Sequence, residues 1–436
     1  MHIAADRMKS VLRWCEYGYV VAVISSLTYG PIYSIWNSAR ISIPLQPIEP
    51  ALLATYVGIQ IPAVFILGRR WCWNDVTKPT VYWLTALVVF LMLTTVWTDM
   101  GRNAAGDSLK MALSTMTGLY IVKSFGRREQ IWLIWAAMQC CVVASRFAIW
   151  HNWADARAAD GDWQGIFTNP NFLGPVASIG LALSVLILID LLISHKSGWR
   201  IPFLILVGDV VLFDAILLYQ TRSWTSIGST VAFLLICAIR PTLALIGQIM
   251  KIESKRLLQV SILAIAGAFF SSMVILYRFF WLLPTNMKNF LYERHLAWAH
   301  SLRGVQAHPF SGWGFNVAWN NLKFRKLDYW WTVEHLGHSH SAYLEVLLSG
   351  GIIAGVLLLI FLFRALWHLS IEWPEGVIES FGVALAFYCL IASLFEPFIV
   401  TGYFLWPLLI IGLLPGKQPV TLTNFDHEGF GVQRQA

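Results

Sequence analysis

Long apolar runs are the feature of this sequence that most restricts its fold. A helix needs about 20 apolar residues to cross the roughly 30 Å core of a bilayer. Runs of about this length lie near residues 14–37, 51–68, 81–99, 107–123, 131–150, 171–193, 201–220, 224–239, 258–279, 341–363, 379–393 and 397–414. Only 13% of the residues are charged, against about 25% in soluble domains. The sequence predicts an all-α polytopic membrane protein with about 12 transmembrane helices in one domain, 1–436.

Positive charges predict the orientation of these spans. Lys and Arg gather in every second connecting segment, counted from the N-terminus, and cytoplasmic loops are enriched in these residues. We therefore expect both termini in the cytoplasm. The net charge of +7 then reflects this bias, and no nucleic-acid partner is expected.

One predicted outer segment, residues 280–339 between the ninth and tenth spans, is much longer than most of the others. A long loop in a compact protein is usually functional. This one is rich in tryptophan and histidine, and we expect it to form short amphipathic helices on the outer leaflet.

Polar groups on the predicted outer side suggest a site, although each also has an ordinary structural explanation. Asn169 and Asn171 flank Pro170 at a helix start; they either cap the helix or help it bind an anion. Arg222 ends the seventh span, where it either reaches lipid headgroups or clamps a phosphate. Arg294 and Trp298 share a helical face, as a stacked pair or as ligand contacts.

The histidines before the tenth span offer a general base. His338 and His340 precede this helix, and imidazole suits proton transfer near neutral pH. The loose spacing of His335, His338 and His340 could instead bind a metal, but no cysteine or strong carboxylate set accompanies it; we expect no metal. Within the spans, Arg146, Asp209 and Asp214 are intramembrane charges, which often mark function. Asp209 could instead pair with a basic group on a neighbouring helix and hold the bundle together.

Four segments in order resemble the O-antigen ligase superfamily. FTNPNFLG at 167–174 resembles its Asn-Pro-Asn helix start, and TRSWTS at 221–226 its Ser/Thr-Arg segment. ERHLAWAHSLRGVQAHPFSGWGFN at 293–316 resembles its Arg-x3-Trp … His-Pro-x-x-Gly-x-Gly stretch, and HSAYLEVLLSGGIIAG at 340–355 its His-containing helix start. Two departures are Ser341, where the family usually has Asn, and the additional His338.

The resemblance implies a GT-C-like glycosyltransferase of the bacterial inner membrane with a periplasmic active site. It implies transfer of a glycan from undecaprenyl diphosphate to a sugar hydroxyl of lipid A–core, with inversion and without a metal or other cofactor. Arg222 and Arg294 match the arginines that would neutralise the leaving diphosphate, and His340 or His338 would be the base. The candidate substrate-binding residues are Arg146, Arg157, Asn169, Asn171, Trp298, Arg303 and Tyr343.

Other activities remain open at this point. The same motifs occur in polymerases of O-antigen or exopolysaccharide and in protein O-glycosylating enzymes. One dominant outer loop favours a ligase. A lipid-linked oligosaccharide transporter would be expected to show inverted repeats and polar groups near the bilayer midplane, which the sequence lacks.

Overall fold

The computed structural model describes residues 2–36, 50–71, 78–153, 155–193, 200–250, 285–327, 337–371 and 380–416, with residues 278 and 378 as single points. Within these ranges every regular element is helical, apart from one isolated β-bridge between Arg157 and Trp163. The predicted ninth span, 258–279, lies outside the described residues except at residue 278, and His335 lies outside them too.

Six described helices are long and apolar enough to cross a bilayer. They confirm the prediction of an all-helical polytopic membrane protein. These helices are α3 (Pro50–Arg70), α5 (Pro79–Leu93, continued by η1, Thr94–Val96), α7 (Arg127–Trp150), α8 (Pro170–Ile193), α9 (Arg200–Gln220) and α14 (Ala342–Ile371). The other larger helices are α1 (His2–Leu27), α2 (Gly30–Trp36), α6 (Gly101–Ser124), α10 (Trp224–Met250), α12 (Thr285–Ala307), α15 (Phe381–Phe395) and α16 (Leu405–Leu413).

Helices α15 and α16 form the centre of the bundle. Both are apolar on all sides, and nearly all of their residues are buried, as expected for helices surrounded by protein. They pack against each other and against α10 and α6. The centre of the described bundle is therefore apolar and buried.

The last predicted span, 397–414, is helical only from Leu405, which corrects its expected length. At nine residues, α16 is about 13.5 Å long, too short to span a bilayer by itself. The cause is local: Glu396 precedes a proline and is extended, at φ −147° and ψ 149°, as pre-proline residues prefer. Val400 then adopts a left-handed φ of 55°. An irregular segment therefore follows α15 directly.

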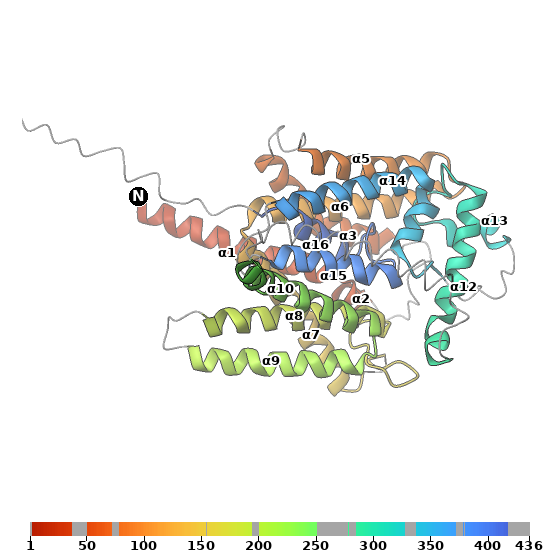
Figure 1. Ribbon diagram of the computed structural model, residues 1–436. Helices are drawn as coiled ribbons and strands as arrows, with labels where there is room; N and C mark the ends of the chain where they lie inside the picture. The colour runs from red at the N-terminus through yellow and green to blue at the C-terminus, as the bar shows by residue number, and fades with distance from the viewer. Residues whose placement is uncertain are drawn as a thin grey trace, which may run out of the picture.

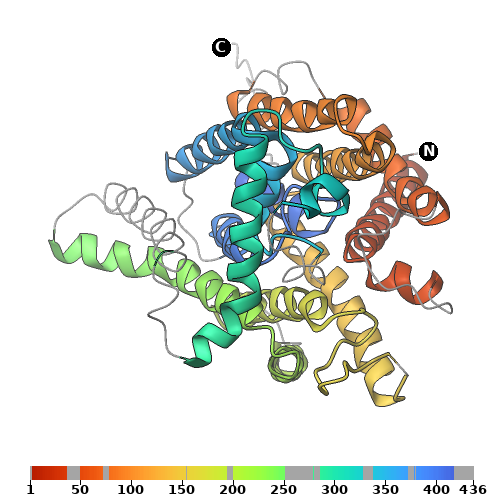
Figure 2. The same ribbon diagram turned by 90° about the vertical axis from the view of Figure 1, so that its right-hand side faces the viewer.

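The segments predicted to lie outside meet at one end of the bundle. Helix α12 crosses this end at a steep angle to the bundle helices, with α13 (Leu322–Arg325) beside it (Figures 1 and 2). The long segment thus contains one helix of 23 residues as well as short ones. The exposed face of α12 carries Glu293, Arg303 and Gln306, whereas Trp298 is buried.

A break in α14 anchors the rest of this segment. Gly350 and Gly351 interrupt the helix with non-helical dihedral angles. The freed groups bind the segment that follows α12: Trp313 N–H donates to Leu348 O at 2.7 Å, and Ile352 N–H donates to Pro309 O at 2.7 Å. The His-Pro-x-x-Gly-x-Gly motif therefore connects α12 to α14.

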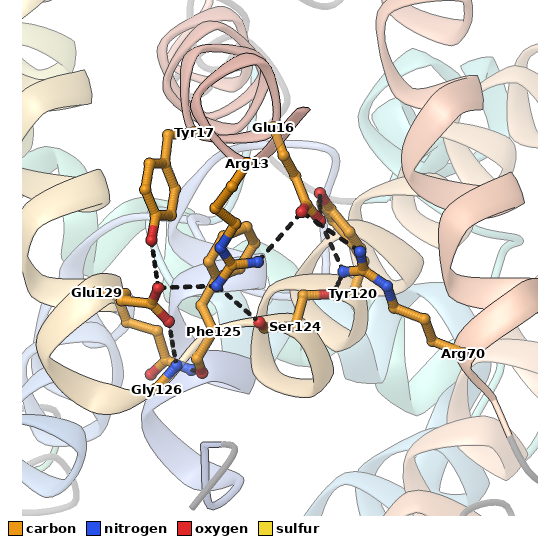
Figure 3. A network of polar contacts seen from close by, with 10 residues as sticks. Arg13, Glu16, Tyr17, Arg70, Tyr120, Ser124, Phe125, Gly126 and Glu129 are labelled. Carbon is orange, nitrogen blue, oxygen red and sulfur yellow. Dashed lines mark hydrogen bonds and ion pairs between the residues drawn. The ribbon is translucent and has the colours of Figure 1, made fainter. Parts of the chain in front are cut away.

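Polar side chains at the opposite end join α1, α3, α6 and α7 (Figure 3). Arg13 contacts Glu129 at 2.8 Å, and Arg70 contacts Glu16 at 2.6 Å. Both arginines also bond to Ser124. Because each arginine has a carboxylate partner, this network stabilises the helix ends and offers no unpaired charge to a ligand.

Candidate functional site

Glu396 is the centre of a polar cluster at the end crossed by α12. Its Oε1 accepts hydrogen bonds from Arg294 Nη2 at 2.8 Å and from Asn171 Nδ2 at 3.4 Å. Its Oε2 lies 3.6 Å from Nδ1 of His340. These partners come from α12, from the first turn of α8 and from the residues before α14. The fold therefore brings Arg294, Asn171 and His340 together around one carboxylate.

His340 is held in an unusual backbone conformation. Its φ is 51°, a left-handed value that costs free energy for a residue with a side chain and occurs often at functional sites. The N–H of His340 donates to Nδ1 of His338 at 3.2 Å, and the two rings are 4.2 Å apart in an edge-to-face contact. Ser339 N–H donates to Glu345 Oε1 at 2.5 Å, which ties the turn to α14.

The two histidines differ in their environments. Burial, together with the charge of His340, lowers the pKa of His338 to about 3, so His338 is neutral near pH 7. Its Nδ1 is already an acceptor. By contrast, Nδ1 of His340 is buried and the ring as a whole is 16% exposed. The exposed part of the His340 side chain therefore does not include Nδ1.

Glu396 remains ionised in this buried position. Burial alone raises the pKa of its carboxyl, but His340 and Arg294 together bring that pKa below its usual range. The side chain of Glu396 is 6% exposed and that of Arg294 12%. This pair is a fixed, desolvated contact.

His338, His340 and Glu396 also have a geometry compatible with a metal ion. One ligand atom from each lies within 4.8 Å of the others. The sequence had suggested His335 as the third member, whereas the structure supplies Glu396. Arg294 already places a positive charge on the same carboxylate, which opposes a cation at this point.

Arg222 belongs to the same end but has a separate partner. It lies in the turn between α9 and α10, with φ 49°. Its Nε is 3.2 Å from Asp162 Oδ1, and its side chain is 68% exposed. The turn packs on α8, because a Cβ on Gly174 would overlap Ser223. The backbone of Arg222 is therefore near the first turn of α8, which carries Asn171.

The two asparagines of the Asn-Pro-Asn motif make different contacts. Asn169 Oδ1 accepts the backbone N–H of Asn171 at 2.8 Å, which is the capping geometry. The side chain of Asn171 instead reaches Glu396. The motif therefore both caps α8 and contributes a side chain to the cluster around Glu396.

Trp298 and Tyr343 both contact α15, the helix that ends just before Glu396. Trp298 is buried and packs on Phe395, with ring centroids 6.4 Å apart. Arg294 donates from Nε to Phe395 O at 3.4 Å, so both motif residues of α12 contact the end of α15. Tyr343 donates to Leu390 O at 2.9 Å and thereby joins α14 to α15.

The three remaining candidate residues are exposed arginines. Arg146 is exposed and stacks over Phe213 at 4.1 Å. Arg157 is exposed beside Trp163, with a guanidinium-to-ring distance of 5.9 Å. Arg303 follows Arg294 by nine residues, about two and a half turns, so it lies on the opposite side of α12 and is exposed.

Asp214 shows how an intramembrane charge can be structural. It is fully buried and accepts from Gln139 Nε2 at 2.7 Å and from Ser184 Oγ at 3.4 Å. These contacts link α9 to α7 and α8 through amide and hydroxyl groups.

Sequence reasoning missed Glu396 itself. It lies in an apolar run, LFEPF, and an acidic residue in such a run is a standard signal of a functional group. Its link to Arg294 spans 102 residues, which no local spacing rule can detect.

Comparisons with known proteins agree with the motifs. The family model for the O-antigen ligase, Wzy_C, matches residues 182–359. This range contains Arg222, Arg294, His338 and His340, and ends before Glu396. Among curated proteins no match is found. The match to residues 182–359 therefore supports the predicted resemblance to the O-antigen ligase superfamily.

Proposed function

We propose that this protein is an O-antigen ligase of the bacterial inner membrane. It would take a glycan from undecaprenyl diphosphate and place it on a sugar hydroxyl of lipid A–core at the periplasmic face. The family match supports a ligase- or polymerase-type membrane glycosyltransferase. The observation that carries the proposal is the convergence of Arg294, His340 and Asn171 on Glu396.

In this mechanism His340 is the general base. Its Nε2 takes the proton from the acceptor hydroxyl, whose oxygen forms the new bond to the anomeric carbon. The bond from that carbon to the diphosphate oxygen breaks, and the electron pair leaves with undecaprenyl diphosphate. One in-line step inverts the anomeric carbon. Glu396 stabilises the imidazolium that forms, because its carboxylate lies 3.6 Å from Nδ1.

The arginines would serve the leaving group. Charge develops on the diphosphate as the glycosidic bond breaks, and fixed guanidinium groups stabilise such charge in place of a metal ion. Arg294 is positioned by Glu396 and by Phe395 O. Arg222 is exposed on a short turn near the same end.

A transfer assay tests the function. Purified protein is mixed with undecaprenyl-diphosphate-linked glycan and lipid A–core in the presence of EDTA. Glycan on lipid A–core supports a metal-independent ligase. Glycan that lengthens on its own lipid carrier identifies a polymerase instead. Loss of transfer on EDTA treatment, with recovery on adding a divalent cation, would contradict the metal-independent mechanism.

The variants Arg222→Ala, Arg294→Ala and His340→Ala should each abolish transfer while the protein still inserts. Lys323→Ala is the matched control, because Lys323 is an exposed cation at the same end, 2.7 Å from Asp99. Near-normal transfer by any of the three variants would remove that residue from the mechanism.

A further inference from the structure

The two candidate arginines are paired in very different ways. Arg294 and Glu396 are 12% and 6% exposed, and Glu396 also binds Asn171. Breaking a buried pair leaves an uncompensated charge, so Arg294 is not free to leave Glu396. Arg222 is 68% exposed, and its Nε lies 3.2 Å from Asp162 Oδ1. An ion pair with such an exposed arginine is weak.

The backbone beneath Arg222 is rigid. Thr221 and Ser223 on either side are buried. Thr221 Oγ1 donates to Leu218 O at 2.7 Å, and Ser223 Oγ lies 2.9 Å from Ser226 Oγ. These contacts anchor the turn on both sides of Arg222, whose own side chain is exposed.

Asp162 is also fixed by its own loop. Ala158 N–H donates to Asp162 O at 2.8 Å, and Trp163 N–H donates to Gln220 O at 3.0 Å, so the loop is attached to the end of α9. The side chain of Asp162 is 14% exposed. Burial and the nearby Asp160 raise the pKa of this carboxyl although Arg222 lowers it. The backbone of Asp162 is thus held in place, whereas its carboxylate is poorly stabilised.

We propose that Asp162 is a resident counter-ion that holds Arg222 until the diphosphate of the donor displaces it. A diphosphate offers several oxygens and more negative charge than one carboxylate, so a guanidinium prefers it. Asp162 then acts through Arg222 as a positioning residue. It sets the affinity for the donor and leaves the chemical step unchanged. This inference rests on the proposed function, because it assumes a diphosphate ligand.

The test compares Asp162→Asn with Asp160→Asn in the full chain. Asn at 162 removes the charge and keeps the shape, whereas Asn at 160 retains an oxygen to accept the N–H of residue 162, as Asp160 Oδ1 does at 3.3 Å. Asp162→Asn should lower the donor KM by about two- to fivefold, the range of a weak exposed ion pair, with kcat unchanged. Asp160→Asn should move KM by a smaller factor.

Binding of inorganic pyrophosphate is measured in parallel by calorimetry. Asp162→Asn should bind it about two- to fivefold more tightly than the wild type. This difference should disappear in an Arg222→Ala background. An unchanged or weaker affinity, or an unchanged or raised donor KM, would overturn the proposal. Absence of glycan transfer by the wild type would instead refute the proposed function, and the pyrophosphate comparison would still decide whether Asp162 competes for Arg222.

Discussion

The carboxylate of Glu396 lies 3.6 Å from Nδ1 of His340 and accepts a 2.8 Å hydrogen bond from Arg294 on its other oxygen. One acidic side chain therefore contacts both the candidate base and a candidate phosphate-binding group. In the proposed mechanism this carboxylate would stabilise the protonated imidazole, as the acidic residue of a catalytic triad does; at 3.6 Å the contact is an ion pair and not a hydrogen bond. This arrangement also explains how Glu396 stays charged while buried.

Glu396→Gln should lower kcat by about 10²-fold or more, because general-base catalysis contributes about 10²–10⁴. The amide keeps an acceptor for Arg294 but loses the charge that stabilises the imidazolium. Transfer is measured at saturating donor and acceptor. Asp99→Asn, which removes an exposed carboxylate at the same end, is the control. An unaltered kcat for Glu396→Gln would show that its charge has no part in the reaction.

Stability should depend on pH through the same residue. The pKa of Glu396 is below its usual range in the folded protein, so its charge stabilises the fold above the pKa of the unfolded chain. This contribution is lost as the pH falls through the folded-state pKa. The difference in Tm between wild type and Glu396→Gln should be largest near neutral pH and should shrink under acidic conditions. A difference that grows on acidification would contradict this assignment.

His338 should hold the backbone of His340 in place and should not act as the base. Its Nδ1 accepts the N–H of His340, and an asparagine oxygen can take such an i+2 bond. His338→Asn should therefore retain more transfer activity than His338→Leu, whereas His340→Asn should lose about 10²–10⁴. Initial rates of the four proteins decide this. Equal losses for His338→Asn and His340→Asn would assign His338 a role in proton transfer.

The helical fold class and six long apolar helices could be predicted from sequence, because apolar length is a local property. Arg294, His340 and Asn171 were singled out from local motifs, and the structure places them around one carboxylate. Glu396 was not, because its role comes from contacts between segments far apart in the chain. Similarly, Asp162 in the loop 151–170 was not predicted as a site residue. It lies beside Arg222 only because the loop is attached to the end of α9. Helix α16 is short because of the backbone conformation at Glu396 and Val400. An apolar run in the sequence does not show such a change in the backbone.

The glycine motifs should prove structural. Gly351 has φ 63°, and a Cβ there would overlap Phe310; Gly312 has φ 64° and faces Gly350. Left-handed strain alone costs about 1–3 kcal/mol per residue. Gly351→Ala and Gly312→Ala should therefore lower the Tm of the purified protein by several degrees, and transfer should fall because α12 carries Arg294. Gly208→Ala on α9 is the matched control, because a Cβ there meets nothing within 4 Å. If Gly351→Ala kept the Tm of the control while losing transfer, the break in α14 would serve the reaction directly and not the attachment of α12.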